Sequence, residues 1–150
     1  MTIALPILPR RSMPRVHLTH RNADIESWLS CFDLDPFVHR HVAKVLRLLP
    51  VEVRLDLMDD PTFQLCDYEP TPGVAFQVPM RLPRRNRASR CVVLKRTLRH
   101  RSEAFTHWLI AHELAHANLR HGGRTPGEDP ELAADALAAE WGFPKPARFS

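Results

Sequence analysis

The stretch from residue 103 to about residue 121 constrains the fold more than any other part of the chain. It contains neither proline nor glycine, and its apolar side chains recur on nearly every face of a helix. They fall on one side at Phe105, Trp108, Leu109 and Ala115, and on another at Ile110, Leu114 and Ala117. A helix that is apolar on most faces must be covered on most sides, so we expect it at the centre of its domain. Ser102 can cap its start, and Gly122 and Gly123 end it.

The length of the chain suits one domain with one core. Its 150 residues, 44% hydrophobic and 25% charged, have the balance of an ordinary globular protein. Residues 1–21 hold arginines and prolines but no acidic residue. They lack the apolar run of a secretory signal, and their prolines oppose the amphipathic helix of a transit peptide. We therefore expect a flexible basic leader over residues 1–21 and a single domain over residues 22–150.

The cysteines and the net charge bear on the compartment and the partners. Cys31, Cys66 and Cys91 are widely spaced and odd in number, which favours a reducing, cytoplasmic location over a disulfide framework. The net charge of +4 is well short of that of a committed nucleic-acid binder. No apolar run approaches the ~20 residues that span a bilayer, so we expect no membrane partner.

Three further helices follow from apolar spacing and from capping residues. One is expected over about residues 22–32, where apolar side chains recur every three or four positions. Asp35 and the proline after it predict the start of a second helix, over residues 36–49. Asp129, also followed by proline, predicts the start of the last helix, over about residues 131–141.

Three strands are expected between the second helix and the central one. Apolar and polar residues alternate over residues 51–57 and again over 74–78, as in half-buried strands. Residues 91–94 form a short, mostly apolar run that predicts the third strand. The order of helices, then strands, then helices indicates an α+β domain with a three-stranded sheet packed on the C-terminal helices.

The central helix carries a candidate metal site. His112 and His116 are four residues apart, so their imidazoles share one helical face and can reach one ion. Zn²⁺ favours such nitrogen ligands. Glu113 is offset by about 100° from His112, which suits a base that takes a proton from the water that the metal activates. Chance predicts only roughly 0.03 such HExxH motifs in a chain of this composition.

The last helix offers a third ligand. Glu131 and Asp135 are four residues apart and share a face. If Glu131 binds the metal, Asp135 can accept a hydrogen bond from the free ring nitrogen of a histidine ligand. Acidic residues are also common in the first turn of a helix for electrostatic reasons, which is the alternative explanation.

The motif HExxH followed by ExxAD, at Glu131, Ala134 and Asp135, resembles that of the gluzincin metallopeptidases. It is most similar to the prenyl-protein and heat-shock protease group without its membrane helices, and to small zinc proteins that cleave repressors. The resemblance covers about residues 102–143. It implies a zincin-like metallopeptidase domain, Zn²⁺ at His112, His116 and Glu131, and Glu113 as general base. It also implies a peptide substrate paired along an edge strand.

Other histidines compete less well for the metal. The metzincin pattern requires glycine at position 119 and histidine at 122, where this chain has Leu119 and Gly122. His121 suits a polar helix end, although as a fourth ligand it would indicate a structural metal site. His107 lies about 140° around the helix from His112, which favours a structural role. The residue that stabilises the oxyanion is not identified by spacing.

Arginines gather in the connection before the third predicted strand, at Arg81, Arg84, Arg85, Arg87 and Arg90. They form a possible basic patch for phosphates or an acidic partner, including nucleic acid. A solvated loop is the simpler interpretation, because charge runs usually occupy loops and edges and no aromatic residue interleaves them.

The expected function is therefore zinc-dependent hydrolysis of peptide bonds in a protein or peptide substrate, with Glu113 as general base. The alternative is a non-catalytic domain that zinc stabilises and that binds DNA or a protein partner.

Overall fold

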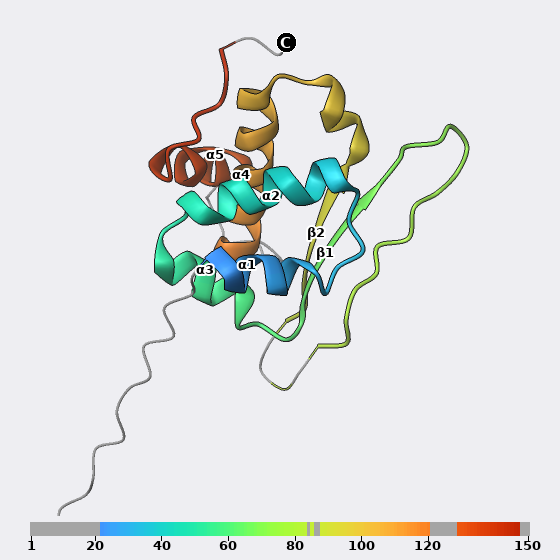
Figure 1. Ribbon diagram of the computed structural model, residues 1–150, viewed down its shortest axis with the longest axis horizontal. Coiled ribbons are helices and arrows are strands. Elements are labelled where there is room, and N and C mark those ends of the chain that lie inside the picture. The colour runs from blue at the N-terminus through green and yellow to red at the C-terminus, as the bar shows by residue number, and fades with distance from the viewer. Residues whose placement is uncertain (1–21, 84, 86–87, 121–128, 148–150) are drawn as a thin grey trace, which may run out of the picture.

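The computed structural model describes residues 22–83, 85, 88–120 and 129–147 (Figure 1). The chain order of the elements is α1 (Asn22–Leu29), α2 (Pro36–Leu48), α3 (Val51–Met58), β1 (Phe63–Tyr68), β2 (Arg90–Lys95), the 3-10 helix η1 (Arg96–His100), α4 (Glu103–Leu119) and α5 (Pro130–Glu140). The expected leader over residues 1–21 lies outside the described residues, as do Gly122 and Gly123.

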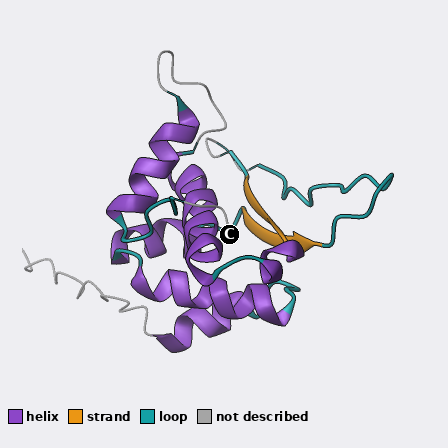
Figure 2. Cartoon of the chain, turned by 90° about the horizontal axis from the view of Figure 1, so that it is seen from above, coloured by secondary structure: helices purple, strands orange, loops and turns teal. Residues whose placement is uncertain are grey.

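The domain is α+β as expected, but the expected zincin-like arrangement around a three-stranded sheet is wrong in its number of strands. In the described residues the sheet has two strands, β1 and β2, which run parallel with Phe63 opposite Arg90 and Tyr68 opposite Lys95. The helices lie on one side of this sheet, and the connection between its strands extends beyond the other side (Figure 2). That connection contains no helix among its described residues, unlike most parallel crossovers.

Residues 51–57 form helix α3 rather than the expected strand. Their alternation of apolar and polar residues also places Val53 and Leu57 four positions apart, and these two are the residues of α3 that are buried. Val51 is instead 49% exposed. Residues four positions apart lie on one face in a strand and also on one face in a helix, so the sequence pattern fits both. Packing of Val53 and Leu57 against the core favours the helix.

The expected strand over residues 74–78 is also absent, while residues 63–68, for which no strand was expected, form β1. Val74 and Val78 are exposed, and the prolines on either side oppose pairing with another strand. In β1 the inward side chains include a buried aspartate, Asp67, which hid the alternation. Asp67 is satisfied there by the backbone N–H of Asp35 at 2.7 Å and by Arg96 at 2.8 Å.

Helix α4 lies at the centre of the helical layer, as its sequence predicts. It packs against α2, α3, α5 and β2, and eight of its residues are buried, including Trp108, Ile110 and Leu114. The Ser102 hydroxyl accepts a hydrogen bond from the backbone N–H of Phe105, which confirms the expected cap. Asp35 and Asp129 cap α2 and α5 in the same way, so all three predicted starts are confirmed.

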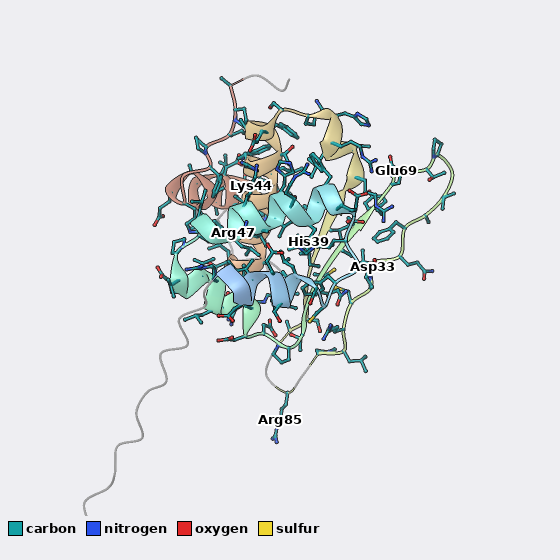
Figure 3. The ribbon with its side chains drawn as sticks, in the orientation of Figure 1. Asp33, His39, Lys44, Arg47, Glu69 and Arg85 are labelled. Atoms are coloured by element: carbon teal, nitrogen blue, oxygen red, sulfur yellow. The ribbon has the colours of Figure 1, made fainter. Side chains whose placement is uncertain are left out.

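Polar contacts fix the outer helices. His39 and Arg47, labelled on α2 in Figure 3, both bind Glu26 of α1.

The guanidinium of Arg90 is 8% exposed and binds Asp56 of α3 and Asp60, each at 2.8 Å, and the carbonyl of Ala117 at 2.9 Å. This one side chain therefore connects β2 with α3 and with the C-terminal end of α4.

Candidate metal centre

Helices α4 and α5 bring the three expected metal ligands together. Nε2 of His112 lies 3.0 Å from Nε2 of His116 and 3.1 Å from Oε2 of Glu131. Nε2 of His116 lies 3.3 Å from Oε1 of Glu131. One ligand atom from each residue lies within 4.8 Å of the other two, so a single ion can contact all three.

Asp135 determines the protonation of His112. Its Oδ1 lies 2.9 Å from Nδ1 of His112, and a carboxylate only accepts, so Nδ1 carries the proton. In a neutral imidazole Nε2 is then an acceptor, yet it faces the carboxylate oxygen of Glu131, which is also an acceptor. A metal ion between the two atoms would satisfy both of them, because imidazole nitrogen and carboxylate oxygen are both metal ligands. The residues present therefore fit Zn²⁺, which takes imidazole nitrogen and carboxylate oxygen as ligands.

Asp135 is itself held in place. The indole N–H of Trp108 donates to Oδ1 at 3.2 Å, and Nζ of Lys145 lies 3.5 Å from Oδ2. Burial alone would raise the pKa of Asp135, but hydrogen bonds from His112 and Trp108 outweigh it and lower the pKa below its usual value. The carboxylate behind His112 is thus ionised at neutral pH.

Glu113 lies beside the ligands, as its offset along α4 predicts. It lines the same cleft as His116 and Glu131. Burial raises the pKa of Glu113; the charge of His112 opposes this rise and that of Glu131 adds to it. A carboxylate with a raised pKa accepts a proton more readily than an exposed glutamate, which suits a general base.

Two of the three ligands, His116 and Glu131, line a cleft of about 570 Å³ between α4, β2, the start of α5 and the segment around residue 79. Its lining is mixed: Val78, Met80, Val93 and Ala117 are apolar, whereas Arg90, Arg120, Glu113 and Glu131 are charged. Among the described residues β2 pairs only with β1, so its second edge has no strand beside it. A cleft with polar groups at one end and an unpaired strand along one wall has room for an extended chain.

The structure separates the arginines that the sequence groups together. Arg81 is exposed and bonds to Gln64 at 3.0 Å and to the carbonyl of Pro61 at 3.2 Å. Arg85 is exposed and points away from the body of the protein (Figure 3). Arg90 is buried in the contacts with Asp56 and Asp60, so it does not belong to an exposed basic patch. Arg84 and Arg87 lie outside the described residues.

Sequence patterns missed three features of this region. The first is the apolar wall of the cleft at Val78 and Met80. These residues lie in the irregular connection between β1 and β2, whose path no residue spacing predicts. Trp108 precedes His112 by four residues, a spacing that places it beside Asp135 once α5 is known.

The third missed feature is a second group of possible ligands, His41, Glu103 and His107. Glu103 and His107 are also four residues apart on α4, which the sequence does show, but His41 belongs to α2. Burial lowers the pKa of both His41 and His107, and the charge of Glu103 opposes this shift. His121, a possible fourth ligand of the first centre, lies outside the described residues.

No family model, curated protein or solved structure matches the chain. Over the described parts of the chain, none of the helices combines the length and apolar character that crossing a membrane requires.

Proposed function

We propose that the chain binds Zn²⁺ through His112, His116 and Glu131 and hydrolyses peptide bonds. The observation that carries the proposal is the acceptor-to-acceptor contact between Nε2 of His112 and Glu131, with Asp135 fixing the proton on the opposite ring nitrogen. A cation resolves that contact, and the HExxH and ExxAD spacings resemble those of zinc peptidases. The ligand group of the described residues has three members, which leaves a fourth position for water or substrate.

The side chains around the ligands divide the chemistry between them. Zn²⁺, when bound, would polarise the scissile carbonyl and lower the pKa of a water molecule. The carboxylate of Glu113 takes a proton from the attacking water as its oxygen bonds to the carbonyl carbon. The same carboxylate returns that proton to the amide nitrogen as the carbon–nitrogen bond breaks, so the products are a carboxylate and an amine. Asp135 keeps His112 in the required tautomer throughout.

The cleft supports an extended peptide or protein segment as substrate. The unpaired edge of β2 offers backbone donors and acceptors to a chain that lies along it, beside Glu113 and His116. Val78, Met80 and Val93 provide an apolar wall for side chains of that segment. Arg120 also lines the cleft at the end of α4, where its exposed side chain pairs with Asp56 at 2.8 Å.

The test compares Glu113→Gln with Glu140→Gln, which replaces an exposed glutamate at the end of α5. Each protein is loaded with one equivalent of Zn²⁺ and incubated with fluorescently labelled casein and with a randomised quenched-peptide library. Zinc is counted by mass spectrometry. We expect Glu113→Gln to retain zinc and lose cleavage by about 10²–10⁴-fold, the usual contribution of a general base. Glu140→Gln should match the wild type.

Two outcomes would contradict the proposal. Full cleavage by Glu113→Gln would show that Glu113 is not the general base. Absence of zinc binding through His112, His116 and Glu131, which we call the triad, would show that these residues form no metal centre. Zinc binding without cleavage in the wild type supports the alternative instead, a non-catalytic domain whose C-terminal helices the metal holds together.

A further inference from the structure

A second group of ligand-type side chains lies at the opposite end of α4 from His116. It consists of His41 from α2 and Glu103 and His107 from α4, and we call it the α2–α4 cluster. None of these residues belongs to the triad of His112, His116 and Glu131, and none lines the cleft beside it.

The α2–α4 cluster repeats the geometry of the triad at the level of ligand atoms. Nδ1 of His41 lies 2.9 Å from Nε2 of His107, as the two Nε2 atoms of the triad lie 3.0 Å apart. Oε1 of Glu103 lies 3.6 Å from Nε2 of His107, and one ligand atom from each residue lies within 4.8 Å of the others. Two imidazole nitrogens and a carboxylate oxygen are a donor set that Zn²⁺ and its neighbours in the first transition row accept.

The surroundings hold the imidazoles in place. His41 is 6% exposed, and its ring packs against Phe37 with centroids 4.4 Å apart and against His107 at 5.1 Å. The rings of His107 and Phe143 are nearly perpendicular, with centroids 6.3 Å apart. Two ligands fixed by packing lose little freedom when they bind an ion, which favours binding.

The outer side of the cluster is open. The side chain of Glu103 is 62% exposed and forms an ion pair with Lys44 of α2 at 3.1 Å. Figure 3 shows Lys44 on the helix that also carries His41. Exposed ion pairs contribute little to stability, so an ion can replace Lys44 beside Glu103. The positive charge of Lys44 nevertheless opposes a cation, and it makes this site weaker than one without such a neighbour.

We propose that His41, Glu103 and His107 form a second site for a divalent transition metal of the zinc type, which links α2 to α4 and binds more weakly than the triad. The remaining coordination positions face solvent on the side of Glu103. Occupancy of the site stabilises the contact between α2 and α4, because an ion that binds only the folded chain shifts the folding equilibrium. The site can hold an ion whether or not the triad is occupied, and it does not depend on hydrolytic activity.

The test counts bound metal in full-length variants titrated with Zn²⁺ and, separately, with Co²⁺, whose absorption reports nitrogen and oxygen ligation. His107→Gln removes one ligand, and Glu103→Gln weakens another at an exposed position where the fold is not at risk. His39→Gln is the matched control, because His39 is also a histidine of α2 but binds Glu26 outside the cluster. Lys44→Gln removes the competing cation.

We expect the zinc count to fall by one equivalent in His107→Gln relative to the wild type, whatever the triad holds. Glu103→Gln should weaken the second equivalent by at least tenfold, Lys44→Gln should tighten it severalfold, and His39→Gln should leave it unchanged. The proposal is overturned if the zinc count is the same in wild type, His107→Gln and Glu103→Gln, or if His39→Gln weakens binding as much as Glu103→Gln. Should His107→Gln fail to fold by circular dichroism, the opposite shifts of Glu103→Gln and Lys44→Gln decide the question.

Discussion

Nδ1 of His112 lies 2.9 Å from Oδ1 of Asp135, a residue on the next helix. The contact joins α4 to α5 at the point where the candidate ligands converge. It fixes the tautomer of His112, and it leaves Nε2 free to face His116 and Glu131. A hydrogen bond of this kind raises the basicity of a metal-binding imidazole and holds its ring in place.

The first prediction concerns that hydrogen bond. Asp135→Asn keeps the size of the side chain but removes its charge, so it stabilises the proton on Nδ1 of His112 less strongly. We expect the affinity of the triad for Zn²⁺ to fall by about 10- to 100-fold. Competition with a chromophoric zinc chelator measures the change. Glu140→Gln on the same helix is the control, and equal affinities of the two variants would show that Asp135 does not orient His112.

The second prediction separates the third ligand from the two histidines. Glu131→Gln leaves His112 and His116 in place and removes the carboxylate that lies 3.1 and 3.3 Å from their Nε2 atoms. Glu131 is a direct ligand, so its loss should weaken zinc binding more than Asp135→Asn does, for which we expect about 10- to 100-fold. The same chelator competition compares the two variants. Unchanged affinity in Glu131→Gln would place the third ligand elsewhere in the chain.

The starts of α2, α4 and α5 were predictable because local chemistry determines them. Ser102, Asp35 and Asp129 accept hydrogen bonds from the backbone N–H groups that follow them, and this requires nothing beyond neighbouring residues. The spacing of His112 and His116 places both imidazoles on one face for the same reason. Only tertiary packing, by contrast, brings Glu131 and Asp135 next to them.

The sheet was predictable only in part. Residues 91–94 were expected to form a strand and lie in β2, but the rest of the pattern depends on partners far along the chain. Residues 51–57 alternate like a strand, but the burial of Val53 and Leu57 makes them a helix. Residues 63–68 conceal a strand, because inward-facing Asp67 is paired with Arg96, a residue distant in sequence. The place of His41 in the α2–α4 cluster was not predictable either, because His41 and His107 lie on different helices and no spacing within one helix relates them.

The third prediction concerns acid stability. Asp60 accepts hydrogen bonds from the backbone N–H and hydroxyl of Thr62, at 2.9 and 2.7 Å, and from Arg90 at 2.8 Å. Burial alone would raise the pKa of Asp60, but these bonds outweigh it and lower the pKa below 3.8. A lowered pKa in the folded state means that the stabilisation is complete above about pH 4 and is lost as the pH falls through the folded value.

Urea unfolding between pH 3 and pH 7 measures this effect. We expect the wild type to lose stability steeply below about pH 4. Asp60→Asn should be less stable by about 1–3 kcal/mol at pH 6 and should show a shallower decline in acid. Asp33→Asn, which replaces an exposed aspartate labelled in Figure 3, should retain the wild-type pH dependence. If the free energy of unfolding of Asp60→Asn falls as steeply below about pH 4 as that of the wild type, other carboxylates cause the loss of stability in acid.

The fourth prediction links the packing of α5 to the metal centre. Ala134 and Ala138 are fully buried, and α5 packs against α4. Their small side chains allow the close approach that brings Glu131 and Asp135 to His112. Ala138→Leu inserts three carbons into this contact, which should destabilise the fold by about 1–3 kcal/mol.

The same substitution should weaken zinc binding, because it pushes the two acidic residues of α5 away from the histidines of α4. Ala136→Leu is the matched control, since Ala136 lies on the exposed face of the same helix. It should change the free energy of unfolding by no more than about 0.5 kcal/mol. Thermal unfolding with and without Zn²⁺ distinguishes the two effects. If Ala138→Leu lowers stability but keeps the full stabilisation by zinc, the position of α5 does not determine the ligand geometry.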